Sequence, residues 1–238
     1  MKNIGTIAYK ELKSYLTSPM AYIVTAIFLL LTGTFFTTYL AGTGYTDTSI
    51  RGFLEPGNIL LLLFSAILTM RLIAEEKKMG TWELLLTAPV RDTEIILGKF
   101  LGSLIMLVGM LVLTLYYPIL LIIMGDPDMG PIGTSYLGLF LLGSASLAVG
   151  TFASSVTSNQ IVAAVLAGGI LFALWFVGMA SNFAPEAIGN LLSYLSLSYH
   201  FPDFIRGVVD TRAIIYYLSI TALFLYLAIR SLETSRWG

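Results

Sequence analysis

Cysteine is absent from this chain of 238 residues, and histidine occurs once. The lack of cysteine excludes disulfide bonds, thiolate catalysis and cysteine metal sites. Because His200 is the single imidazole, one chain can assemble neither a histidine-based metal site nor a Ser-His catalytic pair. The phosphate-binding motif G-x-x-x-x-G-K-[ST] is missing as well. The sequence therefore predicts a chain that is not an enzyme and that binds no cofactor or metal of its own.

Charge is also scarce. Only 11% of the residues are charged and 57% are hydrophobic, whereas soluble domains carry about 25% charged residues. Crossing a bilayer takes roughly 20 predominantly apolar residues, and six segments are candidates: residues 20–40, 57–74, 95–124, 136–153, 161–180 and 213–229. These runs lack the period of two that a membrane barrel needs. We expect an all-α membrane protein with six transmembrane helices, in a single domain over residues 1–238.

The spans contain no ionisable side chain at mid-depth, which argues against a transporter driven by an internal ion relay. Their polar groups are hydroxyls, and helix packing is one explanation of them. The other explanation is a mildly polar lining of a substrate path, for which the candidates are Thr25, Thr32, Ser65 and Thr69. Gly143 and Gly150, seven residues apart on one helical face, favour close packing within the chain over a channel gate.

Positive charge is unevenly distributed between the loops. Six spans place both termini on one side, and that side holds every lysine and arginine except Arg51, Arg206 and Arg212. Because loops rich in lysine and arginine stay in the cytoplasm, the sequence predicts a multi-pass protein of the cell (inner) membrane with cytoplasmic N- and C-termini. A net charge of −1 gives no basic patch for nucleic acid.

The N-terminal segment is amphipathic. Lys10 and Lys13 lie on the polar face of a helix over residues 3–17, and Pro19 ends the pattern. The apolar face comprises Ile4, Ala8, Leu12, Tyr15 and Leu16. We expect residues 1–19 to form an interfacial helix, with a simple extension of the first span as the alternative.

Residues 181–212, between the fifth and sixth spans, also contain an apolar helical face. Its members are Ile188, Leu191, Leu192 and Leu195. Pro202 breaks this pattern. His200 and Asp203 lie at the boundary without a cluster of partners, and we interpret them as structural polar groups and not as ligands.

The segment between the second and third spans is charged and broken by proline. Gly80 and Pro89 bracket a short stretch whose apolar face comprises Trp82, Leu85 and Leu86. Asp92 is the expected N-cap of the third span. We interpret residues 75–94 as a cytoplasmic loop whose short amphipathic helix, from Gly80 to Pro89, lies across the inner membrane surface and transmits force to the two adjacent spans. The alternative is a solvated hairpin whose charges only enforce topology.

Two stretches carry a family resemblance. The sequence "EEKKMGTWELLLTAPVRDTEIILGK", from Glu75 to Lys99, closely resembles the segment between the second and third spans of ABC-2 type transporter permeases. These proteins are the membrane subunits of ATP-binding-cassette exporters. Near the C-terminus, "HFPDFIRGVVDTRAIIYYLSITALFLYLAIRSLETSRW" resembles the gliding-motility-type branch of that family. With the six-span layout, the resemblance covers essentially the whole chain.

The resemblance implies how the chain works. Residues 1–19 would be a connecting helix and residues 181–212 external re-entrant helices. Within the loop of residues 75–94, the stretch from Gly80 to Pro89 would be a coupling helix that docks on a separate cytoplasmic ATPase. The implied coupling residues are Glu75, Glu76, Gly80, Thr81, Trp82, Glu83, Leu84, Leu85, Leu86, Pro89 and Arg91. ATP and magnesium would bind only to the ATPase.

The resemblance also implies partners. Two permease chains, expected to be a homodimer, would work with two ATPase copies to export a substrate along a path from spans one, two and five. An extracytoplasmic accessory subunit is left open. Two alternatives remain: an ATP-driven mechanotransmitter that acts on a periplasmic partner, and a membrane scaffold that transports nothing.

Overall fold

A computed structural model describes residues 2–44, 51–81, 90–125 and 127–235. The elements are α1 (Lys2–Thr17), α2 (Pro19–Gly42), α3 (Arg51–Thr69), α4 (Ala74–Lys78), α6 (Asp92–Thr114), α7 (Tyr116–Met124), α8 (Met129–Val156), α9 (Gln160–Phe176), the 3₁₀ helix η1 (Val177–Phe183), α10 (Glu186–Leu195), α11 (Phe201–Ile205) and α12 (Thr211–Ser235). The described part of the chain contains helices and no strand, so the predicted all-α class is confirmed.

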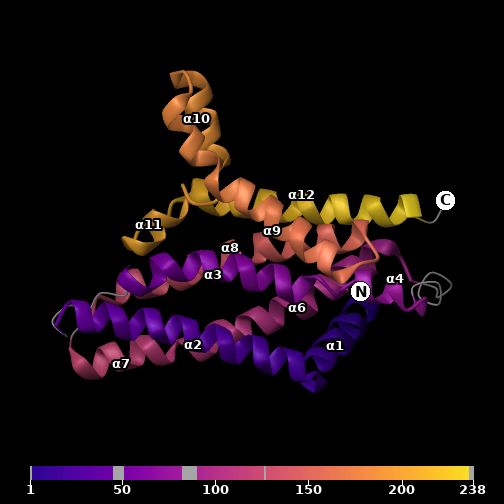
Figure 1. The fold of residues 1–238 in the computed structure, drawn as a ribbon, viewed down its shortest axis with the longest axis horizontal. Helices are drawn as coiled ribbons and strands as arrows, with labels where there is room; N and C mark the ends of the chain where they lie inside the picture. The colour runs from indigo at the N-terminus through magenta and orange to yellow at the C-terminus, as the bar shows by residue number, and fades with distance from the viewer. Residues whose placement is uncertain (1, 45–50, 82–89, 126, 236–238) are drawn as a thin grey trace.

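Six stretches of the described chain are long and apolar enough to cross a membrane. They are Pro19–Gly42, Leu54–Lys78, Asp92–Met124, Met129–Val156, Gln160–Ser181 and Thr211–Thr234. Each contains one of the six predicted spans, extended by a few residues. The spans lie alongside one another, and both ends of the chain lie toward the same end of the bundle (Figure 1). We call this the inner end and the opposite one the outer end, after the predicted orientation.

Helix α8 is the centre of the bundle. It packs against α3, α6, α9, α11 and α12. Of the residues in its most apolar 18-residue stretch, 83% are buried within the chain. Its glycines make this possible, because a Cβ added at Gly143 would lie 2.7 Å from Leu107, and one at Gly150 would overlap the side chain of Thr69. Close backbone approach gives van der Waals packing where lipid supplies no hydrophobic driving force between helices. The prediction that these glycines serve packing within the chain is confirmed.

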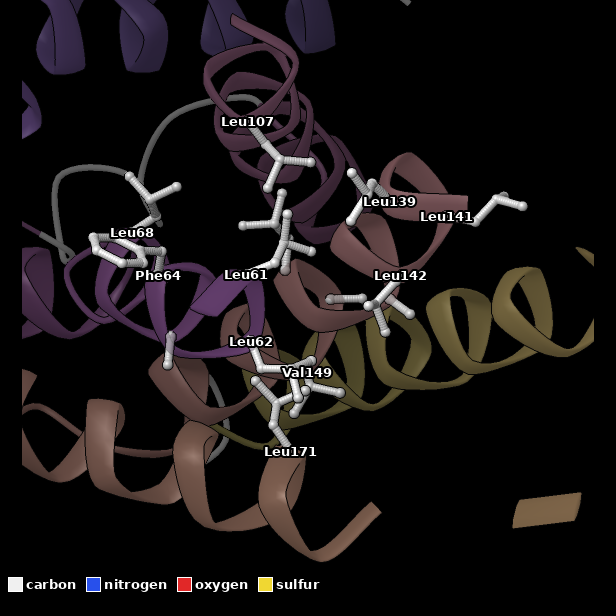
Figure 2. Close-up of a cluster of buried hydrophobic side chains, with 14 of the residues drawn as sticks. Leu61, Leu62, Phe64, Leu68, Leu107, Leu139, Leu141, Leu142, Val149 and Leu171 are labelled. Carbon is white, nitrogen blue, oxygen red and sulfur yellow. The ribbon is translucent and has the colours of Figure 1, made fainter. Parts of the chain in front are cut away.

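Leucine side chains from three helices pack on α8, and those of Leu61 and Leu107 lie beside Gly143. Leu61 and Leu62 of α3, Leu107 of α6 and Leu171 of α9 converge on α8, where Leu142 is fully buried (Figure 2). Such interdigitated side chains pack at nearly crystalline density. The middle of the bundle is therefore a closed apolar core within one chain.

The third span is bent, and its sequence explains the bend. Pro118 in α7 has no N–H to donate to the carbonyl of Thr114, four residues earlier. The hydroxyl of Tyr136, from α8, donates to that carbonyl at 2.9 Å. A neighbouring helix thus satisfies the backbone group that proline leaves free, as a membrane interior requires.

The segment between the fifth and sixth spans leaves the bundle. Helix α10 packs on η1 and stands away from the other helices (Figure 1). Its predicted apolar face is mostly uncovered by this chain, since Ile188, Leu191 and Leu195 are exposed. The helices in residues 181–212 agree with the sequence, and their depth in a membrane stays a prediction.

Candidate coupling site

Five of the residues predicted to couple this chain to an ATPase are described by the structure, and these lie at the inner end. Glu75 and Glu76 lie in α4, Gly80 and Thr81 follow it, and Arg91 directly precedes α6. Gly80 adopts a left-handed φ of 69°, after which Thr81 is helical. The remaining predicted residues lie outside the described part of the chain: Trp82, Glu83, Leu84, Leu85, Leu86 and Pro89. We call residues 70–81 and 90–94, where this segment leaves and rejoins the bundle, the loop base.

The second span breaks before it reaches the loop. Helix α3 ends at Thr69, residues 70–73 form a turn, and α4 begins at Ala74. The Ser154 hydroxyl of α8 accepts hydrogen bonds from the backbone N–H groups of Ile73 (3.0 Å) and Ala74 (3.1 Å), and it donates to the carbonyl of Met70 (3.2 Å). One buried hydroxyl therefore satisfies three backbone groups that the break leaves without helical partners.

A buried lysine fastens the other side of this turn. Lys99 of α6, whose side chain is 3% exposed, donates to the carbonyl of Leu72 at 2.6 Å. The same ammonium contacts Glu76 of α4 at 2.9 Å and Glu11 of α1 at 3.3 Å. An ammonium has three donors, and here they meet acceptors from three different elements. We call Glu11, Glu76 and Lys99 the ion cluster.

Helix α1 lies close enough to α6 to join the ion cluster because of two glycines. A Cβ at Gly98 would lie 2.7 Å from the Cβ of Ile7, and one at Gly102 would lie 2.7 Å from that of Glu11. Glycines four residues apart form a groove on one helical face that admits a second helix. The carboxylate of Glu11 is thereby brought to Lys99.

The junction between α1 and α2 is fixed to the end of α3. Tyr15 is buried and donates its hydroxyl proton to the carbonyl of Leu68 at 2.7 Å. The Arg71 guanidinium lies 4.9 Å from the centre of the Tyr15 ring and donates to the hydroxyl of Ser18 at 3.1 Å. Burial raises the pKa of Tyr15, so its hydroxyl stays a donor at neutral pH. A helix does occupy this segment, although Leu16 of its expected apolar face is 51% exposed. Its position at the membrane interface stays a prediction.

The start of α6 corrects one expectation. Arg91, and not Asp92, is the N-cap of the third span, and Asp92 is the first helical residue. The carboxylate of Glu94 accepts from the backbone N–H of Arg91 at 3.2 Å and from the side chain of Asn3 at 3.1 Å. A carboxylate in the first turn also suits the helix dipole. The interaction ties the beginning of α1 to the point where the loop rejoins the bundle.

Helix α4 is attached to two further spans. The Lys77 ammonium donates to the carbonyl of Ser155, at the end of α8, at 2.5 Å. The hydroxyl of Ser231, on α12, donates to the same carbonyl at 3.3 Å. The loop base is thus bonded to α1, α6 and α8, and through Ser155 it shares an acceptor with α12.

A cleft of about 390 Å³ borders the ion cluster between α1 and α4. Its charged lining mixes both signs: Lys10, Arg71, Lys99, Glu11, Glu75 and Glu76. No group of three or more potential metal ligands occurs in the part of the chain that the structure describes. Three of these charged residues, Glu11, Glu76 and Lys99, pair with one another, and Arg71 contacts Ser18 and Tyr15.

The candidate path residues are distributed along α2 and α3, and Thr69 directly precedes the loop base. Thr32, Ser65 and Thr69 are buried within the chain, and each hydroxyl donates to a carbonyl one turn back in its own helix. Thr25 is half-buried and does the same. The path function of these four residues stays a prediction.

Sequence reasoning missed Glu11 and Lys99. The available signal was a lysine one turn inside an apolar run, because a buried ammonium needs acceptors and points to a carboxylate nearby. The glycines that flank Lys99 were a second signal, since "GKFLG" has the spacing of a close helix contact. Glu11 could not have been selected from the sequence alone, because any of several acidic residues was a possible partner.

Comparison with known proteins agrees with this architecture. Residues 5–236 match the family described as ABC-2 family transporter protein. The chain is also 36% identical over 124 residues to the "Probable multidrug ABC transporter permease YbhS" of Escherichia coli strain K12, and equally to that of Escherichia coli O157:H7. The match covers 48% of this chain and 30% of each relative. The gliding-motility branch stays a prediction. With a family match over nearly its whole length and six membrane-spanning helices, the chain belongs to the ABC-2 family of transporter proteins, as a multi-pass membrane permease.

Proposed function

We propose that this permease couples ATP hydrolysis by a separate cytoplasmic ATPase to export of a substrate across the cell membrane. Two copies of this chain form the membrane part, and two ATPase subunits bind ATP and magnesium. The N- and C-termini and residues 75–94 face the cytoplasm. Family membership supports this assignment, because ABC-2 permeases are the membrane subunits of such transporters.

The ion cluster is the observation that carries the coupling role. A push on residues 75–94 arrives first at the loop base, where Glu76 is held by the buried ammonium of Lys99. Because the same ammonium holds Glu11 and the carbonyl of Leu72, α1 and both adjoining spans move with the loop. A solvated hairpin that only enforces topology has no need of a buried charge shared by three elements, since burying a charge is costly unless it is paired.

The nature of the cargo follows from the spans. Hydroxyls without mid-depth charges suit an amphiphilic cargo better than a strongly ionic one. The name of the relatives, a probable multidrug permease, points the same way. Thr25, Thr32, Ser65 and Thr69 are the candidate contacts, and the three buried ones become available only if the helices around them move apart.

The decisive experiment uses the complex in lipid. The chain is co-expressed with the ATPase subunit encoded nearest to it, purified, and reconstituted into liposomes for measurement of ATP hydrolysis. We expect the ATPase to co-purify with the wild type, and Glu83→Ala and Leu85→Asp to lose binding or membrane-stimulated hydrolysis. Lys99→Met should keep ATPase binding and lose stimulation, whereas Lys78→Met, an exposed neighbour, should behave as wild type. Melting curves establish that each variant is folded. An ATPase that does not bind, or variants that all match the wild type, would leave the scaffold as the better description.

Orientation has a simple test because the chain contains no cysteine. Thr81→Cys and Arg206→Cys each introduce a single thiol at the inner or the outer end. A maleimide that cannot cross membranes should label the second and not the first in intact cells. The reverse pattern would overturn the proposed direction of transport.

A further inference from the structure

A cleft of about 440 Å³ opens at the outer end of the bundle. It lies where the end of α10, the short helix α11 and the first turn of α12 meet (Figure 1). Its lining consists of Tyr194, Tyr199, His200, Pro202, Asp203, Arg206, Asp210 and Arg212. This volume lies within the usual range for pockets that bind small molecules. None of these residues takes part in the coupling site.

The single histidine forms one wall of this cleft. His200 is 5% exposed, its ring is stacked on Tyr216 with the centres 4.2 Å apart, and Tyr194 and Tyr199 meet it edge-on. Its Nε2 lies 3.0 Å from the carbonyl of Tyr194. Because a carbonyl only accepts, Nε2 carries a proton, and in the neutral ring Nδ1 is an acceptor.

The acceptor nitrogen is left for a ligand. Nδ1 has no hydrogen-bond partner in the described part of the chain, and it is not among the polar atoms there that are sealed from solvent without a partner. It therefore faces open space, and the open space that His200 lines is the cleft. The ring itself is buried and stacked on Tyr216, so a ligand in the cleft would meet Nδ1 as an acceptor in a fixed position. The interpretation of His200 as purely structural accounts for Nε2 and leaves Nδ1 unexplained.

The charges around the cleft are balanced in number and differ in availability. Asp210 is engaged at the start of α12, where it accepts from the backbone N–H of Arg212 at 2.8 Å. Asp203 and Arg206 form a loose, exposed pair at 3.7 Å, which a ligand can open at little cost. Two guanidinium groups and one available carboxylate thus share the cleft with Nδ1 of His200. The half-exposed rings of Tyr194 and Tyr199 add surfaces that attract a cation.

We propose that this cleft binds a zwitterionic phosphoethanolamine group, the headgroup of a membrane phospholipid. Arg206 and Arg212 contact the phosphate, while Asp203, Nδ1 of His200 and the tyrosine rings receive the ammonium. Mixed charge fits a zwitterion better than a simple anion, which Asp203 would repel. The position fits as well, because Thr211 begins the sixth span and the cleft therefore lies where that helix enters the bilayer. Exposed tyrosines are typical of this level.

The test compares lipids that differ only in headgroup. The full chain in detergent is mixed with phosphatidylethanolamine, phosphatidylcholine or phosphatidylglycerol of identical acyl chains, and bound lipid is counted by native mass spectrometry. Phosphatidylethanolamine should bind about tenfold more tightly than the other two, since a choline has no N–H to donate and a glycerol has no charge to pair. Equal binding of all three lipids would overturn the proposal.

Variants locate the site. Arg212→Gln and Asp203→Asn should each lose most of this preference while the unliganded protein melts as the wild type, because both side chains lie at the surface of the cleft. His200→Phe keeps the ring stack and removes both Nδ1 and the hydrogen bond from Nε2 to the carbonyl of Tyr194. It should lose the preference for the ammonium-bearing lipid, and its melting curve shows whether the lost hydrogen bond also affects stability. Glu186→Gln, on the exposed surface of α10, is the matched control. Retention of the preference in both Arg212→Gln and Asp203→Asn would place the lipid elsewhere and refute the site.

Soluble phosphoethanolamine distinguishes the source of the ligand. If the millimolar compound displaces the lipid, the headgroup alone is recognised and a free zwitterion can also occupy the cleft. If it does not, the acyl chains contribute and the site is specific for a membrane lipid. Neither result depends on an ATPase or on transport.

Discussion

The two ends of this permease solve opposite problems. At the inner end, Lys99 is nearly sealed from solvent and shares its ammonium with Glu11, Glu76 and a backbone carbonyl. At the outer end, the ion pair of Arg206 and Asp203 is exposed and long, and α10 stands apart from the bundle. Buried charges fix one geometry, because each lost partner leaves another uncompensated. Exposed charges constrain the local geometry only weakly, because water can replace a lost partner. The buried ion cluster therefore holds the inner end in one geometry, whereas the exposed ion pair leaves the outer cleft able to accept a ligand.

The largest expected effect comes from the centre of the ion cluster. Lys99→Met leaves two carboxylates and the carbonyl of Leu72 without their shared cation, and we expect a loss of about 3–5 kcal/mol of stability. Thermal unfolding in detergent measures the loss, with Lys78→Met as the exposed control. If both variants melt alike, the ion cluster does not hold the inner end together.

The next effect tests the break in the second span. Ser154→Ala deprives the backbone N–H groups of Ile73 and Ala74 of their acceptor, which should cost about 1–3 kcal/mol. Ser146→Ala is the control on the same helix, because that buried hydroxyl only donates to the carbonyl of Leu142 one turn back. Hydrogen exchange at residues 70–74 should rise in the first variant alone. Unchanged exchange there would show that the turn does not need Ser154.

A third comparison uses two glycines of one helix. Gly98→Ala forces a Cβ to within 2.7 Å of Ile7 and should cost about 1–2 kcal/mol while loosening α1. Gly109→Ala meets nothing within 4 Å and should be neutral or stabilising by about 0.5–1 kcal/mol. The melting temperature should therefore fall in Gly98→Ala and stay level or rise in Gly109→Ala. Movement in the same direction would mean that the contact between α1 and α6 is not tight.

A smaller effect, of opposite sign, is expected in the outer half of the second span. Asn58 is 3% exposed, and its carbonyl oxygen has no hydrogen-bond partner in the described part of the chain. Asn58→Leu removes an unsatisfied polar atom and should raise stability by up to about 1 kcal/mol. A fall in melting temperature well beyond that of a Leu62→Ile control would show that the amide has a partner in the folded protein.

The smallest effect on stability is expected from the exposed ion pair at the outer end. Arg206→Gln removes an exposed pair and should change stability by less than about 0.5 kcal/mol at moderate salt. Its melting temperature should follow that of the wild type from low to high salt. A loss approaching that of Lys99→Met would erase the distinction between a fixed inner end and an open outer one.

Hydropathy was enough to find all six spans, because a long apolar run in a bilayer must satisfy its own backbone hydrogen bonds and therefore forms a helix. The glycines of α8 and the helix before Pro19 were also readable, since their signals are local. The partners of Lys99 could not be predicted from the sequence. Glu11 lies 88 residues from Lys99 and Glu76 precedes the loop, so only the packing of α1 on α6 brings the three together. The N-cap of α6 was misassigned by one residue because Glu94, and not Asp92, supplies the carboxylate that caps Arg91.

At the outer cleft, too, the sequence did not predict which distant segments would come together. The sequence identified His200 and Asp203 as isolated polar residues. No spacing in it predicted that α10, α11 and α12 would meet around them. The orientation of a histidine nitrogen depends on which carbonyl its partner nitrogen reaches. That is a property of three converging chain segments and not of any one of them.

Helix α8 joins the two ends. It begins at Met129 beside α11, where Gly138 receives the ring of Phe204, and it finishes at Ser154 and Ser155, which hold the loop base. At 1.5 Å per residue its 28 residues form a rod of roughly 42 Å. Most of that rod is enclosed by its own chain. If residues 75–94 are pushed as proposed, one continuous helix leads from the loop base to the outer end.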